Sequence, residues 1–191
     1  MNSLDARVRY TRMVIENAFM ELLKEKSAAR ITVTEICQAA QINRATFYKH
    51  YLDVPDLLEQ IEDRLLSELK TAIGEIPESG EVTEEVLLDK MEKMFSFIKS
   101  GASQYMILAG DGADPSLPMK TFQLISSMFY PVLAQRIPEK SDAYKEMLYH
   151  FLTLGFGGAL MTWIRRGMQE DCRELAKFLL SLSMGATSMY Q

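Results

Sequence analysis

The most informative part of the sequence is residues 31–61, ITVTEICQAAQINRATFYKHYLDVPDLLEQI. Its first helical pattern begins at Thr32 or Thr34, and Asn43 precedes a second pattern over 44–51. Thr and Asn are favoured helix N-caps because a side-chain oxygen accepts a backbone N–H. Helices of about eight residues are unstable alone. The stretch therefore predicts two short helices packed on a longer one, as in a helix-turn-helix.

Helical periodicity continues on both sides of this stretch. Apolar residues recur at spacings of three and four over 4–26, which predicts a long amphipathic helix. Asp53 and Pro55 mark the start of the next helix, expected over 53–74. No alternating strand pattern is found, so the sequence predicts an all-α fold of about nine helices. The remaining helices are expected over 84–100, 104–110, 116–137, 142–167 and 171–189.

The net charge of −5 is distributed unevenly along the chain. Residues 1–51 contain eight basic and five acidic residues, a balance of +3, whereas residues 52–191 contain 13 basic and 21 acidic residues, a balance of −8. Gly and Pro make 74–80 the clearest linker. We therefore predict two domains with different roles, 1–51 and 52–191, connected by the helix at 53–74. Further breaks are expected at Gly101, 110–115, Pro138 and Gly167.

Composition excludes several classes of protein. The 191 residues are 48% hydrophobic and 25% charged, which is typical of a globular chain. The chain has ten Gly and two Cys, Cys37 and Cys172, which excludes collagen and a disulfide scaffold and favours a cytoplasmic location. The most apolar run, 151–164, is shorter than the roughly 20 residues that a membrane span requires, so no membrane partner is expected.

The composition of the second short helix is typical of one that enters a DNA major groove. Phe47 and Tyr51 are four residues apart, and Phe47 is expected to pack inward. Arg44 is suited to a bidentate contact with guanine, and Ala45 and Thr46 to a thymine methyl group or a phosphate. Three further residues carry donors suited to phosphate oxygens, which fix register without reading sequence: Tyr48, Lys49 and His50.

Several residues in this region also fit a structural role. Tyr48 and Tyr51 fit the core, a role we favour for Tyr51, and His50 fits the C-cap of its helix. Cys37 is expected to be a small core residue rather than a redox sensor. Three arginines ahead of the stretch either form a solvated face or reach flanking phosphates: Arg7, Arg9 and Arg12.

With these residues in place, the sequence resembles the DNA-binding region of TetR/AcrR-type transcriptional regulators over residues 8–66. In that family a threonine opens the second helix, the recognition helix carries Thr-Phe-Tyr, here 46–48, an aromatic residue ends it, and a leucine-rich fourth helix follows. The resemblance implies a homodimeric, all-helical repressor whose three N-terminal helices bind an operator half-site. By position, the DNA contacts fall on Thr32, Thr34, Arg44, Ala45, Thr46, Tyr48, Lys49 and His50.

Two positions depart from the family pattern. Gln41 stands where the family usually has Gly, so either a positive φ there costs of order 1 kcal/mol or the turn is of a different kind. Val54 stands where the fourth helix usually offers a Lys to the DNA backbone. One phosphate contact per half-site is therefore in question, with backbone amides of that helix as the replacement.

The C-terminal half resembles more weakly the regulatory domain of a subset of the same family, through Gly155, Gly157, Gly158, Trp163, Gly167 and Met168. This resemblance implies dimerisation through the last two long helices. Gly155 and Ala159 are one turn apart, and so are Gly158 and Thr162, which permits either close approach of a partner helix or close packing within one subunit. The predicted dimerisation residues are Gly155, Gly158, Ala159, Thr162, Phe178 and Leu182.

The resemblance also implies an effector pocket in the C-terminal half. Met and aromatic side chains line adaptable apolar cavities, although at helical spacing they are more often plain core. The predicted effector residues are Met94, Ile98, Met106, Phe122, Tyr130, His150, Phe151 and Trp163, chosen from a wider set that adds Met91, Phe95, Tyr105, Gln123, Met128, Phe129 and Met161.

Enzyme chemistry is not indicated by the sequence. His50 and His150 are the only histidines, and no metal-ligand spacing, Ser-His-Asp set or phosphate loop is found, so no catalytic residue, metal or cofactor is predicted. Asp111 and Asp114 lack the rest of a calcium loop.

We therefore expect a homodimeric regulator, a repressor that a small apolar effector releases from a pseudo-palindromic DNA operator. Its two recognition helices would enter major grooves about 34 Å apart. The alternatives are a ligand-independent regulator and a helical adaptor of the same fold that acts through protein contacts.

Overall fold

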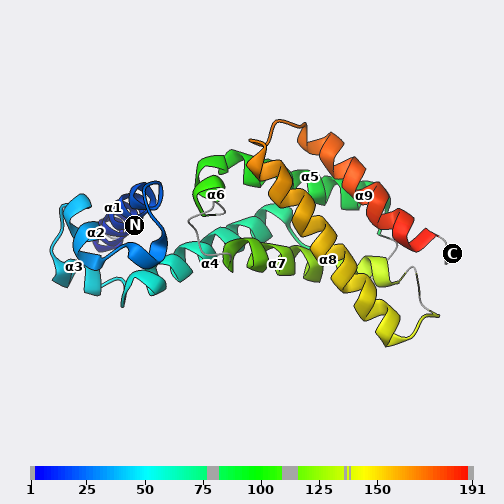
Figure 1. Cartoon of the computed structure of the whole chain (residues 1–191), viewed down its shortest axis with the longest axis horizontal. Coiled ribbons are helices and arrows are strands. Elements are labelled where there is room, and N and C mark those ends of the chain that lie inside the picture. Colours follow the sequence, from blue (N-terminus) through cyan, green and yellow to red (C-terminus); the bar gives the residue numbers. More distant parts are fainter. Residues whose placement is uncertain (1–2, 77–81, 109–115, 136, 138, 189–191) are drawn as a thin grey trace. The chain divides into compact units, whose positions relative to one another are not determined.

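A computed structural model of the chain describes residues 3–76, 82–108, 116–135, 137 and 139–188. Within these residues the chain forms nine α-helices and one short 3-10 helix, and no strand (Figure 1). The predicted all-α fold is confirmed. Several predicted features lie wholly or partly outside the described residues: the linker at 74–80, the loop at 110–115, Pro138 and the last residues of the helices predicted over 104–110 and 171–189.

The chain divides into two compact units. The first comprises Met1–Leu65 with Met106–Pro115, and the second comprises Leu66–Tyr105 with Ser116–Gln191. The division falls inside the helix α4 (Val54–Ile73), which belongs to both units. The predicted boundary between two domains after residue 51 therefore stays a prediction.

The first unit is built on α1 (Ser3–Leu23), against which α2 (Val33–Ala39) packs, and α2 in turn contacts α3 (Arg44–Tyr48). A 3-10 turn, η1 (Ala28–Arg30), occupies the break that follows α1. Burial of one face of each helix holds these short elements together, because none has enough internal hydrogen bonds to be stable alone. Its fully buried side chains include Ile15, Phe19, Ile36, Phe47 and Leu57.

A capping box fixes the start of α2. The Thr32 hydroxyl accepts from the backbone N–H of Glu35 at 3.3 Å, and the Glu35 carboxylate accepts from the backbone N–H of Thr32 at 2.9 Å. Lys26 donates to the same carboxylate, and these hydrogen bonds lower the pKa of Glu35 to about 2. Of the two threonines that the sequence left open, Thr32 is therefore the N-cap.

The turn between α2 and α3 requires a left-handed residue at Gln41, where φ is +54°. The backbone N–H of Ile42 donates to the carbonyl of Cys37 at 3.0 Å, the hydrogen bond that closes such a helix end. Of the two alternatives for Gln41, the positive φ is therefore the one present, and it costs of order 1 kcal/mol relative to Gly.

The recognition helix α3 is shorter than predicted. Asn43 caps it through a 2.8 Å hydrogen bond from the N–H of Thr46, but the helix ends at Tyr48 and not at residue 51. Lys49 and His50 donate to carbonyls three residues earlier, so the chain tightens after Tyr48. This tightening turns Tyr51 into the core, where its side chain is 2% exposed.

Buried polar contacts join Tyr51 to α1 and α4. The Tyr51 hydroxyl donates to one oxygen of Glu16 at 2.9 Å, and Arg64 donates to the other at 2.6 Å. The Arg12 guanidinium lies over the Tyr51 ring and donates to Gln60 at 2.9 Å. This group of five residues, the Glu16 network, ties the end of the recognition helix to both long helices.

The second unit pairs α5 (Glu84–Ser100) with α9 (Cys172–Ser188), and α7 (Ser116–Ala134) with α8 (Asp142–Arg165), as Figure 1 shows. A short helix, α6 (Ala102–Leu108), follows α5. Residue 157 of α8 is Gly for a packing reason, because a Cβ there would lie 2.6 Å from the Phe122 ring of α7.

Several predicted helix ends differ from the structure by a few residues. The helix expected over 116–137 ends at Ala134, and the one expected over 142–167 ends at Arg165. Gly167 and Met168 both have positive φ there, and Met168 donates to the Trp163 carbonyl, which stops α8.

Among the described residues, α8 is the one helix long and apolar enough to cross a membrane. This helix begins at Asp142, upstream of the predicted apolar run 151–164, and its 24 residues are enough to cross a bilayer. Length therefore does not exclude a membrane span. Length and composition alone are weak support for one, since a core helix passes the same test, and α8 packs on α7.

Replacing Gln41 by Gly is expected to raise the free energy of unfolding by up to about 1 kcal/mol, because Gly adopts the left-handed conformation without steric cost. Urea unfolding followed by circular dichroism measures the change. Gln38→Gly, in the preceding helix, is the control and is expected to destabilise instead. An equal loss of stability in both variants would contradict the strain argument.

Burial beside Glu16 raises the pKa of Tyr51 to about 12. A tyrosine in the unfolded chain ionises near pH 10, so the stability contributed by neutral Tyr51 is complete below about pH 10 and is lost as the pH approaches 12. Tyr51→Phe is expected to lower the free energy of unfolding by about 1–3 kcal/mol at neutral pH, because Glu16 loses a buried donor. The difference between variant and wild type should shrink above about pH 10. Tyr10→Phe, at an exposed position of α1, is the control, and a pH-independent difference for Tyr51→Phe would contradict the assignment.

Candidate functional site

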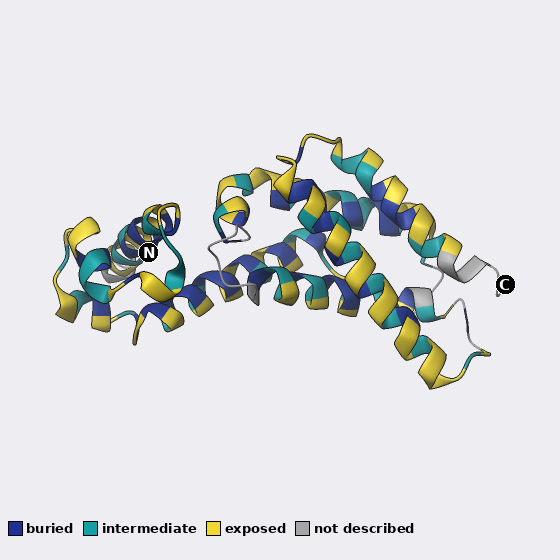
Figure 2. Ribbon diagram, in the orientation of Figure 1, coloured by how far each residue is buried: buried dark blue, intermediate teal, exposed yellow. Residues whose placement is uncertain are grey.

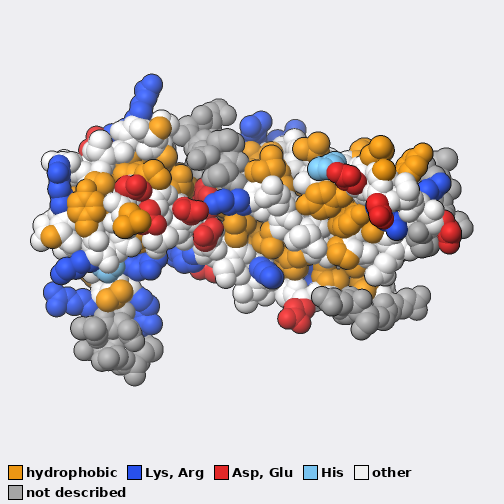
Figure 3. Space-filling model, turned by 90° about the horizontal axis from the view of Figure 1, so that it is seen from below, with side chains coloured by type: hydrophobic (Ala, Val, Ile, Leu, Met, Phe, Trp, Pro, Cys, Tyr) orange, Lys and Arg blue, Asp and Glu red, His pale blue; other side chains and the backbone are white. Residues whose placement is uncertain are grey.

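The eight predicted DNA-contact residues lie together on the first unit, at the start of α2 and along α3. Five are exposed, including Thr32 at the start of α2, and the other three are half-buried: Thr34, Thr46 and His50. Figure 3 shows Lys and Arg side chains gathered on one side of this unit. The exposed four on α3 and at its end are Arg44, Ala45, Tyr48 and Lys49.

Arg44 is oriented by a residue of the other short helix. One terminal nitrogen of its guanidinium donates to the hydroxyl of Thr34 at 2.5 Å. The guanidinium has five N–H donors, so most of its fork remains for an acceptor such as guanine. The contact places two predicted DNA residues side by side across the turn, which their separation in sequence did not reveal.

The hydroxyl protons of two predicted contacts are already used. Thr32 donates to the Glu35 carboxylate at 2.8 Å, and Thr46 donates to the Asn43 side chain at 3.0 Å. A phosphate oxygen is an acceptor only, so it competes with these caps for the same protons. Thr46 is therefore better suited to its methyl contact with thymine than to a phosphate.

The alternatives left open for the aromatic residues are now decided. Tyr48 is 55% exposed and only touches Phe47 edge to face, so the core role is wrong for Tyr48 and correct for Tyr51. Phe47 is fully buried, as predicted. The C-cap of α3 is Lys49, so the capping role for His50 is wrong.

His50 lies half-buried in a basic environment. Burial, and then the charges of Arg12 and Lys49, lower its pKa below the ordinary value. His50 is therefore neutral at neutral pH and offers one N–H donor.

The three N-terminal arginines have separate environments. Arg12 belongs to the Glu16 network and is half-buried, so it takes a structural role that neither sequence alternative included. Arg7 and Arg9 are exposed on α1.

The start of α4 is a poor anion site. Val54 is buried, Pro55 has no N–H, and the N–H of Asp56 donates to Asp53 at 2.8 Å. The Asp56 carboxylate in turn accepts from the N–H of Leu52 at 2.7 Å. One of the helix amides expected to replace the Lys is thus already used by a carboxylate, and the negative charges of Asp53 and Asp56 disfavour a phosphate there.

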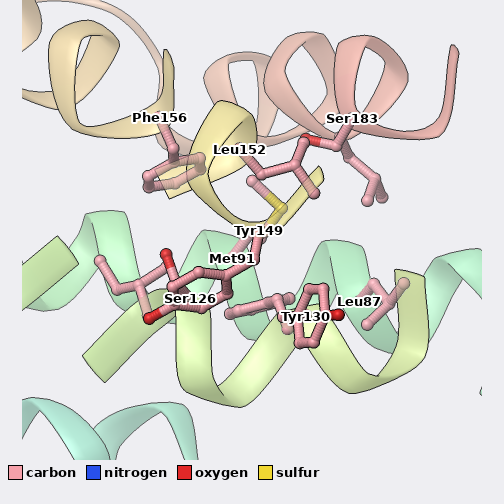
Figure 4. A pocket seen from close by; sticks show the side chains of 11 residues that line it. Leu87, Met91, Ser126, Tyr130, Tyr149, Leu152, Phe156 and Ser183 are labelled. Carbon is pink, nitrogen blue, oxygen red and sulfur yellow. The ribbon is translucent and has the colours of Figure 1, made fainter. Parts of the chain in front are cut away.

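The second unit contains a cavity between its helix pairs. Side chains of α5, α7, α8 and α9 leave a space of about 490 Å³ between them, including the part open to solvent (Figure 4). Among the described residues, the lining consists of Leu87, Met91, Ile125, Ser126, Phe129, Tyr130, Tyr149, Leu152, Phe156, Leu180 and Ser183.

Of the eight predicted effector residues, only Tyr130 lines this cavity, with Met91 and Phe129 from the wider set. The other seven are placed elsewhere because helical spacing does not show which face points inward. Phe122 is half-buried against residue 157, Phe151 and His150 are exposed on α8, and Met106 is exposed in the first unit. The remaining three are fully packed core: Met94, Ile98 and Trp163.

Five of the six predicted dimerisation residues are exposed on α8 and α9, and Ala159 is half-buried. A Cβ added at Gly155 or Gly158 would meet nothing within 4 Å, unlike one at residue 157. Figure 2 shows exposed residues recurring along both helices. We name as the α8–α9 stripe the exposed residues Met147, Phe151, Leu154, Gly155, Gly158, Thr162, Phe178 and Leu182.

The described residues contain no group of three or more His, Cys, Asp or Glu able to hold a metal ion. Cys37 is buried, and burial raises the pKa of its thiol, which is unfavourable for the reactive thiolate.

The known proteins to which this chain is similar include transcriptional regulators. Residues 85–185, more than half of the chain, match the family model of a TetR-type transcriptional regulator C-terminal region. The chain is 27% identical over 180 residues to the uncharacterized HTH-type transcriptional regulator YxbF of Bacillus subtilis (strain 168). That alignment covers 93% of this chain but 45% of the relative, so the chain spans less than half the length of this curated relative.

Solved structures share the fold over nearly the whole chain. A TetR transcriptional regulator from Streptococcus agalactiae 2603V has a TM-score of 0.70 at 24% identity, with 95% of this chain and 99% of that chain covered. The dihydroxyacetone kinase operon activator DhaS has a TM-score of 0.62 at 18% identity, with 95% and 98% covered. The fold, the helix-turn-helix geometry and the match over residues 85–185 agree: this chain belongs to the TetR family of transcriptional regulators.

Proposed function

We propose that the chain is a homodimeric DNA-binding regulator that recognises a pseudo-palindromic operator through α3. The observation that carries this proposal is the presentation of Arg44 from the start of α3, held by Thr34 and flanked by exposed Tyr48 and Lys49. A bidentate arginine reads guanine, and the flanking donors fix the register on phosphates. Regulation of transcription, rather than catalysis, is the corresponding activity, and the cytoplasm its location.

The proposed partner is a second copy of the same chain. The α8–α9 stripe exposes Phe151 and Leu154 at 66% each and Phe178 at 59%, which is unusual for large apolar side chains on a surface without a partner. Its glycines leave room for close approach of another helix. A two-fold interface of this kind would place two copies of α3 in register with two half-sites.

The direction of regulation is proposed from the family resemblance of the N-terminal region, which implies a repressor released by a small effector. DhaS, a protein of the same fold, is named an activator, so the fold itself does not determine the direction. A reporter gene placed behind a bound DNA fragment distinguishes the two roles.

Replacement of Arg44 or Lys49 by Ala is expected to weaken binding to a DNA fragment selected from a random pool by the wild-type protein. Loss of Arg44 should cost about 1–3 kcal/mol and relax the preference at one base pair of each half-site. Loss of Lys49 should weaken binding to all DNA sequences alike. It should also make binding less dependent on salt, by about one phosphate contact per half-site. Fluorescence anisotropy at several salt concentrations measures both effects.

Lys24→Ala is the matched control, since it removes one exposed positive charge of the same unit that pairs with Glu21. If Arg44→Ala and Lys49→Ala bind as tightly as this control, the assignment of the surface is wrong.

Leu154→Glu and Phe178→Glu are each expected to convert the dimer to a monomer, because a carboxylate in an apolar two-fold interface is desolvated twice. Sedimentation velocity measures the mass, and circular dichroism checks that the monomer is folded. Met119→Glu, which changes an exposed apolar residue of α7, is the control. A wild-type chain that sediments as a monomer would contradict the proposal.

A further inference from the structure

The described residues that line the cavity of the second unit have two kinds of side chain. Seven of these lining residues have apolar side chains, which are those of Leu, Ile, Phe or Met. The other four carry hydroxyl groups. None of the described lining residues is Lys, Arg, His, Asp or Glu. The four hydroxyl-bearing residues are Ser126, Tyr130, Tyr149 and Ser183.

Among the described residues, the lining has no charged group that could neutralise a charged ligand. Transfer of an unpaired charge from water into such a site is strongly unfavourable. An anion is disfavoured further near Tyr130, because the charges of Asp142 and Glu146 act on its hydroxyl. The tyrosine hydroxyls are neutral and can both donate and accept.

The hydroxyls come from three helices and differ in what they offer. Ser183 of α9 donates its proton to the carbonyl of Leu179 at 2.9 Å, so toward the cavity it presents acceptor lone pairs. Ser126 of α7 shares a 2.7 Å hydrogen bond with Thr153 of α8. The rings of Tyr130 and Tyr149 meet edge to face, with their centroids 5.2 Å apart. A flat ring in a ligand can extend such an aromatic cluster. Met91, with its flexible thioether, adapts to the shape of what enters.

We infer that the cavity binds an uncharged, mainly apolar, ring-containing molecule that carries at least one hydroxyl or comparable oxygen. A hydroxyl group both donates and accepts, so it can use the Ser183 lone pairs or a tyrosine hydroxyl whichever way it is presented. This inference rests on the proposed function in that the cavity is taken as its effector site.

The test uses four compounds that share one ring system: 2-naphthol, naphthalene, 2-naphthoate and 2-naphthylmethylammonium. Each competes with the neutral fluorophore N-phenyl-1-naphthylamine for the full chain, and its dissociation constant is obtained by displacement. We expect 2-naphthol to bind about tenfold or more tightly than either ion and several-fold more tightly than naphthalene, since its hydroxyl adds one neutral hydrogen bond. Tighter binding of either ion, or equal binding of naphthalene and 2-naphthol, would overturn the inference.

Two serines of α9 provide the matched variants that locate the binding. Ser183 lines the cavity, whereas Ser181 is exposed and belongs neither to the described lining nor to the α8–α9 stripe. Ser183→Phe fills the cavity and should abolish displaceable fluorescence, and Ser181→Phe should leave it unchanged. Circular dichroism checks folding, and Ser183→Leu serves if the larger side chain unfolds the chain. Equal binding by the wild type and a folded Ser183 variant would show adsorption on the exposed stripe and reject the cavity.

The outcome for the ligand class is separate from the outcome for the proposed function. Binding of 2-naphthol that fails to change the affinity for the selected DNA fragment would support the ligand class and reject the effector role. Selected DNA that binds normally, with no compound bound in the cavity, would reject the ligand class and leave the DNA-binding proposal standing.

Discussion

The buried carboxylate of Glu16 is the constraint on which the geometry of the first unit depends. Burial of a carboxylate is unfavourable unless it is paired and hydrogen-bonded. Glu16 meets both conditions through the Tyr51 hydroxyl and the Arg64 guanidinium, one on each oxygen. Those two partners lie just after α3 and on α4, so satisfying one charge on α1 fixes where the recognition helix ends. A helix of five residues has few hydrogen bonds of its own, and its orientation must come from contacts such as these.

The exposed side of α3 follows from this anchoring. Because Phe47 and Tyr51 are held inside, the helical spacing directs Arg44 and Tyr48 outward. The caps act in the same direction, since Asn43 and Thr32 use their side chains to begin α3 and α2. The left-handed Gln41 joins the two, and its strain is tolerated because the helices on both sides determine the path of the turn.

The helix-turn-helix was predictable from the sequence because its signals are local. A Thr or Asn cap and an apolar period act over four to eight residues, so Asn43 and Phe47 can be assigned from the sequence alone. The Glu16 network was not predictable, because Tyr51 and Glu16 are 35 residues apart and nothing local distinguishes this Glu from its exposed neighbours. The cavity was missed for a similar reason. On α8 the inward Leu152 and the outward Phe151 are equally apolar, and only packing against α7 shows which faces the interior.

The inward and outward residues of α8 are hard to distinguish in the sequence because α8 has two apolar faces. One face of α8 lines the cavity through Tyr149, Leu152 and Phe156. Residues of the same turns, such as Phe151 and Leu154, belong to the exposed α8–α9 stripe. In α9, Ser183 and Leu182 divide in the same way. A helix moves as a rigid element over one or two turns, so a change that displaces Leu152 also displaces Leu154. These two apolar faces explain why α8 is long and apolar enough for a membrane span by length and composition, although α8 packs on α7.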